Sequence, residues 1–170
     1  YIESKNIQNL KNEIFKNPSK DHQQITNLID KFSGQVSGES IIEKNQVEIK
    51  EIFEQENIEE ILNKTYSLSQ NGSEFSKNTE HELKGKSPTS LKITFKQIHM
   101  ATEMSLRDAL IMEYRMVQRC QASGDFYEGV RAMLVDKDRN PQWKPSNLDK
   151  VDEIWVNHFF EPLHEKDLKI

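Results

Sequence analysis

Apolar residues recur every three or four positions along most of the chain, whereas stretches that alternate between apolar and polar residues are scarce. A recurrence of this kind places the apolar residues on one side of an α-helix. The pattern therefore predicts a mainly α-helical chain. The predicted helices are Ile2–Lys16, Ile25–Phe32, Ile49–Phe53, Ile58–Leu62, Pro88–Ile98, Ser105–Cys120, Asp125–Leu134 and Leu148–Phe160.

Residues at the predicted helix ends support this assignment. Ser87 suits an N-cap and Pro88 the first helical position, where the missing N–H removes no hydrogen bond. Ser105, with Asp108 three residues later, is a variant of the capping box. Gly124 is predicted to end the Ser105–Cys120 helix in a left-handed cap. Loops or turns are predicted at Asn17-Pro18, 33–40 and Asn71-Gly72.

Three consecutive helices in the second half of the chain carry distinct apolar stripes. Short links join these helices, which are therefore expected to pack as neighbours. The first stripe consists of Leu91, Phe95 and Ile98. The second consists of Ala109, Leu110, Tyr114, Val117 and Cys120 or Gln121. The third consists of Phe126, Val130, Met133 and Leu134.

Charge is distributed unevenly along the chain. Residues 1–86 carry 11 basic and 15 acidic side chains, whereas residues 87–145 carry nine basic and seven acidic ones, including all five arginines. Arginine forms forked contacts with phosphate, so the second block is compatible with an anionic ligand, although helix-surface arginines also pair with carboxylates. The acidic stretch 39–60 is either the solvated face of amphipathic helices or a contact surface for a basic partner. The latter would make the chain a helical interaction module.

The overall composition narrows the class of protein. A length of 170 residues fits one domain or two small lobes, and an apolar fraction of 35% supports a modest core. The net charge of −5 argues against nucleic acid as the main ligand. No apolar run approaches the roughly 20 residues of a membrane helix, so no membrane partner is predicted. The sequence begins at Tyr1 without a targeting leader, which is typical of a processed product or a fragment.

No catalytic or metal-binding constellation stands out. The five histidines lack the i, i+3 or i, i+4 spacing that brings two ligands together on a helix, so no metal site is predicted. Neither the G-x-S-x-G nucleophile motif nor the G-x-x-x-x-G-K-[ST] phosphate loop occurs. His99 is interpreted as a half-buried polar residue, and Cys120, the single cysteine, as a small core residue. No catalytic residue is predicted in this chain.

Four sequence blocks nevertheless carry a family resemblance. They are "SPTSLKIT" (87–94), "MEYRMVQRC" (112–120), "DFYEGVRAMLVDKDRNPQWKP" (125–145) and the terminal "DLKI" (167–170). In this order and spacing they resemble the C-terminal half of 3-hydroxyisobutyryl-CoA hydrolases, which belong to the crotonase (enoyl-CoA hydratase/isomerase) superfamily. The resemblance is strong from about Lys86 to Pro145 and looser before Gly85.

The resemblance implies an acyl-CoA thioester hydrolase of mitochondrial valine catabolism, located in the matrix. Its substrate would be 3-hydroxyisobutyryl-CoA, cleaved to 3-hydroxyisobutyrate and CoA, with no cofactor because CoA is part of the substrate. The complete fold of the family has an N-terminal β/α spiral core that holds the oxyanion-hole amides and the catalytic carboxylates. This chain resembles only the helical C-terminal region, without that core. The implied partners are the N-terminal core, the acyl-CoA and a further copy of the protein.

The resemblance also implies which residues lie near CoA. In related hydratases, an aromatic residue and a lysine near the final helix approach the CoA nucleotide. The corresponding candidates here are Phe126, Met133, Lys137 and Arg139. Alignment on "EGVRA" places Asp136, rather than Lys137, at the position of that lysine. The alternative is that "DKDR" is a solvated turn whose charges pair locally, and that Trp143 caps the core together with Pro141 and Pro145.

These expectations divide the chain into three segments. Residues 1–86 form an acidic helical segment that packs on the core, residues 87–145 form the helical crotonase-like region, and residues 146–170 form the C-terminal helix and tail. In this interpretation the chain supplies the scaffold and the cover of the CoA channel and is inactive alone. The alternative function is a hydrolase-derived structural subunit in the small subunit of a mitochondrial ribosome, which requires a basic surface that only residues 87–145 offer.

Overall fold

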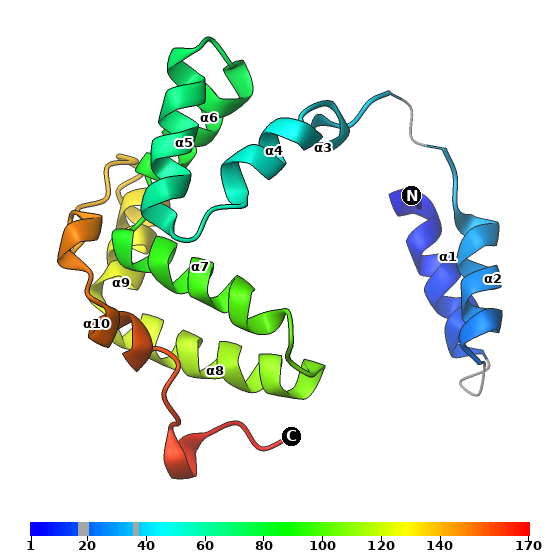
Figure 1. Cartoon of the computed structure of the whole chain (residues 1–170). Helices are drawn as coiled ribbons and strands as arrows, with labels where there is room; N and C mark the ends of the chain where they lie inside the picture. Colours follow the sequence, from blue (N-terminus) through cyan, green and yellow to red (C-terminus); the bar gives the residue numbers. More distant parts are fainter. Residues whose placement is uncertain (17–20, 36–37) are drawn as a thin grey trace. The chain divides into compact units, whose positions relative to one another are not determined.

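The computed structural model describes residues 1–16, 21–35 and 38–170, and these ranges contain helices but no strand (Figure 1). The prediction of a mainly α-helical chain is therefore confirmed. The predicted helix end at Asn17-Pro18 and part of the predicted 33–40 loop lie outside the described residues. Two compact units make up the chain, Tyr1–Gln46 and Val47–Ile170. None of the described helices is long and apolar enough to cross a membrane.

The first unit contains α1 (Ser4–Phe15), α2 (His22–Phe32) and the short α3 (Ile41–Lys44). Helices α1 and α2 pack on each other. Asp21 starts α2 through a capping box, in which its side chain accepts from the Gln24 N–H and the Gln24 side chain accepts from the Asp21 N–H. None of the described residues of this unit is buried. A pair of amphipathic helices without a buried residue has no core of its own.

The second unit begins with three helices that share a small apolar cluster. These are α4 (Gln46–Phe53), which starts at the unit boundary, α5 (Ile58–Gln70) and α6 (Glu74–Lys84). Ile52 of α4 is fully buried against Ile58 and Ile61 of α5. Helices α5 and α6 form an antiparallel hairpin (Figure 1), and its turn follows Asn71, as predicted, with Gly72 at φ 95°. Only glycine reaches this conformation without a steric cost.

Helices α7 (Pro88–Ala101) and α8 (Leu106–Ala122) frame the main core (Figure 1). Both predicted starts are confirmed, because the Ser87 side chain accepts from the Ser90 N–H and the Ser105 side chain accepts from the Asp108 N–H. The Asp108 carboxylate accepts from the Ser105 hydroxyl at 2.6 Å rather than from its backbone N–H, so the capping box is only half formed. The core contains Ile93, Met112, Met116, Val151, Val156 and Phe159.

The predicted stripe of α8 is wrong in part. Met112 and Met116 are the buried residues of this helix, whereas Leu110 and Val117 are 43% and 50% exposed. The two methionines lie one turn apart and face α7 and the C-terminal segment, so they define the inward face. Leu110 and Val117 therefore belong to an apolar surface that the second unit itself leaves open.

The connection after α8 also differs from the prediction. Ser123, in an extended conformation, ends α8, and Gly124 is the first residue of α9 (Gly124–Val130) rather than a left-handed cap. A π-helical turn, η1 (Arg131–Val135), extends α9. The prediction failed because Ser123 serves both helices: its N–H closes the last turn of α8, and its extended backbone starts α9.

The predicted helix Leu148–Phe160 is two elements. A 3₁₀ turn, η2 (Leu148–Lys150), ends at Val151, which is extended and buried in the core. Helix α10 (Glu153–His158) starts afresh because Asp152 accepts from the Trp155 N–H. A final 3₁₀ turn, η3 (His164–Lys166), precedes the C-terminus. The tail is held to α8 by Arg115, which forms a bidentate pair with Asp167, with Nε to Oδ1 at 2.8 Å.

The two units divide after Gln46, and α5 contacts α7 across residue 86. The three-segment division at residues 86 and 145 stays a prediction. Lys92 of α7 strengthens this connection, with its Nζ 2.7 Å from the Glu59 carboxylate and 3.0 Å from the Val151 carbonyl oxygen. The packing of residues 1–86 on a core elsewhere stays a prediction.

Candidate functional site

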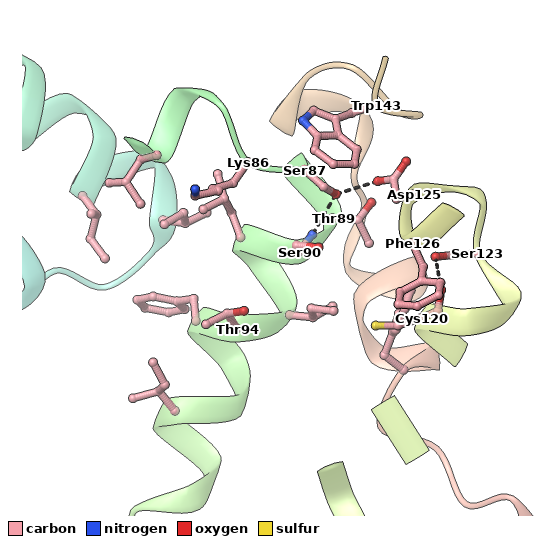
Figure 2. Close-up of a pocket in the computed structure, with 18 of the residues that line it drawn as sticks. Lys86, Ser87, Thr89, Ser90, Thr94, Cys120, Ser123, Asp125, Phe126 and Trp143 are labelled. Atoms are coloured by element: carbon pink, nitrogen blue, oxygen red, sulfur yellow. Dashed lines mark hydrogen bonds between the residues drawn. The ribbon is translucent and has the colours of Figure 1, made fainter. Parts of the chain in front are cut away.

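An apolar cavity of about 610 Å³ lies within the second unit, between α5, α7 and the start of α9 (Figure 2). Its apolar walls come from three places in the sequence: Phe53, Ile58 and Ile61; Leu91, Phe95 and Ile98; and Cys120, Phe126, Trp143 and Phe159. The stripe Leu91, Phe95 and Ile98, predicted for one face of α7, thus lines the cavity. Ile98 is 61% exposed, which shows how open the cavity is.

Polar contacts close one end of the cavity. The Ser87 hydroxyl, which caps α7, also donates to Asp125 Oδ2 at 2.6 Å (Figure 2). Asp125 Oδ1 accepts the backbone N–H of Lys144 at 2.9 Å. Both carboxylate oxygens are therefore engaged, and one aspartate holds together the start of α7, the start of α9 and the segment that follows Trp143. A single charge-assisted hydrogen bond of this kind contributes about 1.5–3 kcal/mol.

Trp143 forms the wall next to this junction (Figure 2). Its Nε1–H donates to the carbonyl oxygen of Gly85 at 3.0 Å. Its ring lies against Gly129, where a Cβ atom would come within 3.3 Å of the ring carbon Cη2. Glycine at this position of α9 therefore allows the indole to pack directly on the helix backbone. Trp143 is thus a fixed part of the cavity wall.

Cys120 is placed as the sequence interpretation expects, whereas His99, expected to be half-buried, is exposed. The Cys120 thiol lines the cavity (Figure 2) and packs against the main core, and burial raises its pKa. A raised pKa leaves less thiolate at neutral pH, which disfavours a nucleophilic role. His99 Nδ1 lies 2.9 Å from the Phe95 carbonyl oxygen within α7. Among the described residues, no three His, Cys, Asp or Glu side chains are grouped to hold a metal ion.

A charged turn follows η1 and is organised by Arg131. The guanidinium forms a bidentate pair with Glu128, with Nη2 to Oε1 at 2.8 Å and Nε to Oε2 at 2.9 Å. Nη1 donates to Asp136 at 2.6 Å and to Asp138 at 2.7 Å, and Nη2 donates to the carbonyl oxygen of Asn140 at 3.2 Å. The side chain has five N–H donors, and all five are used. Arg131 therefore fixes the path of the chain from Asp136 to Asn140.

Two of the carboxylates around Arg131, Glu128 and Asp138, have a lowered pKa. Its hydrogen bonds, followed by the backbone N–H of Gln142, lower the pKa of Glu128 from 4.5 to about 2. The pKa of Asp138 is also lowered, first by Arg131 and then by the Asn140 N–H. Arg131 itself has its pKa raised by the same partners. Glu128, Asp138 and Arg131 are consequently ionised at neutral pH.

The four predicted CoA-proximal residues are split by the structure. Phe126 lines the cavity, whereas Met133, Lys137 and Arg139 are exposed and do not line it. Lys137 and Arg139 have left-handed backbone, with φ of 58° and 55°, which costs about 1–2 kcal/mol for a residue with a Cβ atom. Within the part of the chain that the structure describes, neither side chain has an ion-pair partner.

Sequence reasoning did not single out Arg131, Asp125 or Ser87 as a connected set. The hydrogen bonds of the site join distant positions. Ser87 and Asp125 are 38 residues apart, and Gly85 and Trp143 are 58 residues apart. The signal available was the proximity of these residues to the quoted blocks: Ser87 and Asp125 begin two of them. Arg115 and Asp167 likewise join two blocks. The blocks that carry the resemblance meet pairwise in space.

Comparison with curated proteins extends this resemblance over the whole chain. The chain is 38% identical over 176 residues to the mitochondrial 3-hydroxyisobutyryl-CoA hydrolase of Gallus gallus and 36% identical to that of Danio rerio, each matched over 100% of this chain. The human enzyme of the same name is 41% identical over 76% of this chain. The chain spans only 44% and 45% of the chicken and zebrafish proteins, so it corresponds to less than half of their length.

Solved structures show the same fold. A carnitinyl-CoA dehydratase from Mycobacterium thermoresistibile superposes with a TM-score of 0.77 at 22% identity, over 99% of this chain and 46% of that one. An enoyl-CoA hydratase from Rhodobacter sphaeroides gives a TM-score of 0.73 at 24% identity. The predicted helical region of a crotonase-like fold is confirmed, as is the resemblance to the C-terminal half of the hydrolases. Because the enoyl-CoA hydratase/isomerase model matches residues 1–160, the chain belongs to the enoyl-CoA hydratase/isomerase family.

Proposed function

We propose that this chain is the helical part of a mitochondrial acyl-CoA thioester hydrolase of valine catabolism, which cleaves 3-hydroxyisobutyryl-CoA to 3-hydroxyisobutyrate and CoA. The observation that carries the proposal is the match of the entire chain, at 36–38% identity, to the chicken and zebrafish enzymes of that name. The relatives are named as mitochondrial, which supports that location. The chain would act together with an N-terminal region like the one that these longer relatives contain.

The chemistry of the site supports this division of roles between the chain and an N-terminal region. Hydrolysis of a thioester requires hydrogen-bond donors aimed at the developing oxyanion and a carboxylate that directs water. Asp125 is the only carboxylate among the described residues that line the cavity, and both of its oxygens are occupied by Ser87 and Lys144. Because each oxygen already accepts one structural hydrogen bond, we assign Asp125 a structural role rather than the activation of water. The proposal therefore assigns both catalytic functions to the N-terminal region.

The cavity would contribute by docking that N-terminal region and covering the acyl-CoA channel. Its walls are largely apolar, and Ile98 and Phe126 expose 61% and 47% of their surface. Apolar surface gathered in an open hollow is typical of an interface that another part of a protein covers. The relatives contain more than twice the length of this chain, which supplies an occupant of sufficient size.

Phe126, Met133, Lys137 and Arg139 would lie near CoA. The unpaired cations of Lys137 and Arg139 suit the phosphate groups of the nucleotide, because phosphate is bound by ammonium and guanidinium donors. Phe126 and the exposed Met133 would flank the channel with apolar surface. In this arrangement the charged turn supplies phosphate contacts, and the cavity supplies the interface to the region that performs the chemistry.

A chimaera tests this function. The part of the chicken hydrolase that matches this chain is replaced by the 170 residues, and release of free CoA thiol from 3-hydroxyisobutyryl-CoA is measured. We expect the chimaera to hydrolyse the substrate with a kcat/KM within about tenfold of the chicken enzyme, and the 170-residue chain alone to release no thiol above the uncatalysed rate. A folded but inactive chimaera, or hydrolysis by the chain alone, would contradict the proposal.

Sedimentation distinguishes the ribosomal alternative. A structural subunit of a mitochondrial ribosome would sediment with the small subunit at moderate salt, whereas a hydrolase would sediment as a free protein or a small homo-oligomer. The phosphate contacts of a ribosomal protein would weaken steeply as salt rises, because counterions compete for the RNA. We expect the free form.

A further inference from the structure

We propose that Arg131 is a positioning residue for ligand phosphate: it holds Asp136 and Asp138 so that Lys137 and Arg139 remain unpaired and available to an anion. The inference rests on the proposed function in one respect, the identity of the anion as a phosphate of CoA. Arg131 itself would not touch the ligand.

The sequence of the turn poses a problem that Arg131 solves. In "DKDR", acidic and basic residues alternate, and oppositely charged neighbours on an exposed turn readily pair with each other. Here the two aspartates at 136 and 138 both point to Nη1 of Arg131, at 2.6 and 2.7 Å. The intervening residue, Lys137, and the following one, Arg139, are left without an ion pair among the described residues. The two acidic side chains of the turn thus contact Arg131, and the two basic ones do not.

The backbone of the turn is consistent with this sorting. Lys137 and Arg139 adopt φ of 58° and 55°, a left-handed conformation that persists only where surrounding contacts enforce it. The enforcing contacts are present: the Asn140 carbonyl oxygen accepts from Arg131, the Asn140 N–H donates to Asp138 Oδ1 at 2.9 Å, and the Arg139 N–H donates to the Ala132 carbonyl oxygen at 3.1 Å. Arg131, Glu128, Asp136 and Asp138, here called the hub, therefore fix the backbone from which the Lys137 and Arg139 side chains project.

Glu128 gives the hub its anchor on α9. It engages Arg131 with both oxygens and also accepts the Gln142 N–H at 2.6 Å, so the turn is attached to the helix at its start and at its end. Three carboxylates and three cations of this region balance in charge: Glu128, Asp136 and Asp138 against Arg131, Lys137 and Arg139. Without the guanidinium, three carboxylates would face two cations, and the adjacent aspartates would compete with any anionic ligand.

Binding of adenosine 3′,5′-bisphosphate to the 170-residue chain tests the inference, with adenosine as the phosphate-free control. We expect the wild-type chain to bind the bisphosphate in a salt-sensitive manner and adenosine much more weakly. Arg131→Gln should weaken bisphosphate binding about tenfold, and the double variant Lys137→Gln/Arg139→Gln should weaken it at least as much. Arg119→Gln is the matched control, because among the described residues Arg119 donates to the carbonyl oxygens of Glu161 and Pro162 and to no residue of the charged turn. The affinity of this variant for the bisphosphate should stay unchanged.

A rescue variant separates positioning from simple loss of structure. Adding Asp136→Asn and Asp138→Asn to Arg131→Gln removes the carboxylates that would capture the cations, and affinity should return to within about threefold of wild type. If Arg131→Gln does not fold, as judged by thermal unfolding, Arg131→Lys provides the second variant, because an ammonium keeps the charge but cannot reproduce the forked contacts. We expect that variant to weaken binding about threefold.

The outcomes of this test are distinct from those of the chimaera. Absence of bisphosphate binding by the wild-type chain, unchanged affinity in a folded Arg131→Gln variant, or failure of the rescue variant would each overturn the role of Arg131. An inactive chimaera whose 170-residue part still binds bisphosphate in an Arg131-dependent manner would refute the hydrolase proposal and leave the positioning role intact.

Discussion

The charged turn and the apolar cavity of the second unit complete their contacts in opposite ways. In the turn, Arg131 uses every donor, and Glu128 serves both the guanidinium and the Gln142 N–H, so the groups around the guanidinium are satisfied within one short segment, while Lys137 and Arg139 stay unpaired among the described residues. In the cavity, Ile98 and Phe126 remain largely exposed beside an open hollow. The comparison teaches that the contacts of Arg131 are complete within the chain, whereas the cavity has an open apolar side, which the proposed N-terminal region would cover.

Helix α8 shows the same contrast between buried and exposed apolar residues. Met112 and Met116 are buried, at 3% and 6% exposure, whereas Leu110 and Val117 on other faces of the helix stay open. An isolated small domain gains nothing from exposed apolar positions of this kind, but a helical region that packs on a larger core does. The predictions that follow test how sharply closed and open regions are separated.

The largest loss of stability is expected in the main core of the second unit. Phe159 is 1% exposed at the centre of the main core, and Phe159→Ala should lower the free energy of unfolding by about 3–5 kcal/mol through lost burial and cavity formation. Ile154→Ala on the neighbouring α10 is the control, because Ile154 is 81% exposed, and it should cost less than about 0.5 kcal/mol. Urea unfolding measures both. Equal losses would show that no closed core exists here.

The open region should respond in the opposite way. Ile98→Lys should leave the stability of the 170-residue chain unchanged within about 0.5 kcal/mol, because the side chain already faces solvent. In the chimaera, the same substitution should lower kcat/KM at least tenfold, since it would bury a charge in the proposed interface. Ile154→Lys provides the matched control. Loss of stability without loss of activity would assign Ile98 to the core instead.

Trp143 lies between the main core and the open side of the cavity, and its substitution should have an intermediate effect on stability. Trp143→Phe keeps an aromatic ring near Gly129 but removes the hydrogen bond from Nε1 to the Gly85 carbonyl oxygen. The expected loss is about 1 kcal/mol in the free energy of unfolding, read from thermal or urea unfolding. A loss above about 3 kcal/mol would mean that the ring supports the core rather than the wall of the cavity.

The charged turn should make the stability of the chain depend on pH in the acid range. The folded-state pKa of Glu128 is about 2, below its ordinary 4.5, so its contribution to stability is fully present above pH 4.5 and is lost as the pH falls toward 2. Glu128→Gln should therefore make the stability of the chain less dependent on pH between 4.5 and 2, with little change in slope above pH 5. Urea unfolding at a series of pH values tests this. A variant with the wild-type slope in that window would remove Glu128 from the hub.

Local signals in the sequence were sufficient for much of the fold. The pair Ser87-Pro88 and the turn at Asn71-Gly72 depend on a few adjacent residues, and both are where the pattern placed them. Gly124 and the Leu148–Phe160 helix were misplaced, because Ser123 and Asp152 supply competing helix ends, and the burial of Val151 favours an extended residue between two elements. Tertiary packing overrode the local preference there.

The site was less accessible to sequence reasoning because its contacts depend on how the chain folds back, over five and seven residues at Arg131 and over 38 residues at Ser87. The run "DKDR" shows four charges but not that a fifth residue, Arg131, selects the two acids. Likewise, nothing local to Ser87 indicates that its hydroxyl donates to Asp125 as well as capping α7. Of the four predicted CoA-proximal residues, Phe126 is the one that the structure places in the cavity.

The proposed closure of the cavity by the N-terminal region is tested most directly at Cys120. This thiol lines the cavity and is the single cysteine of the 170 residues, so its alkylation by iodoacetamide can be followed by mass spectrometry of one peptide. We expect alkylation in the folded chimaera to be at least tenfold slower than in the 170-residue chain, and equal in both once they are unfolded. Equal rates in the folded proteins would show that the cavity stays open and that the N-terminal region does not cover it.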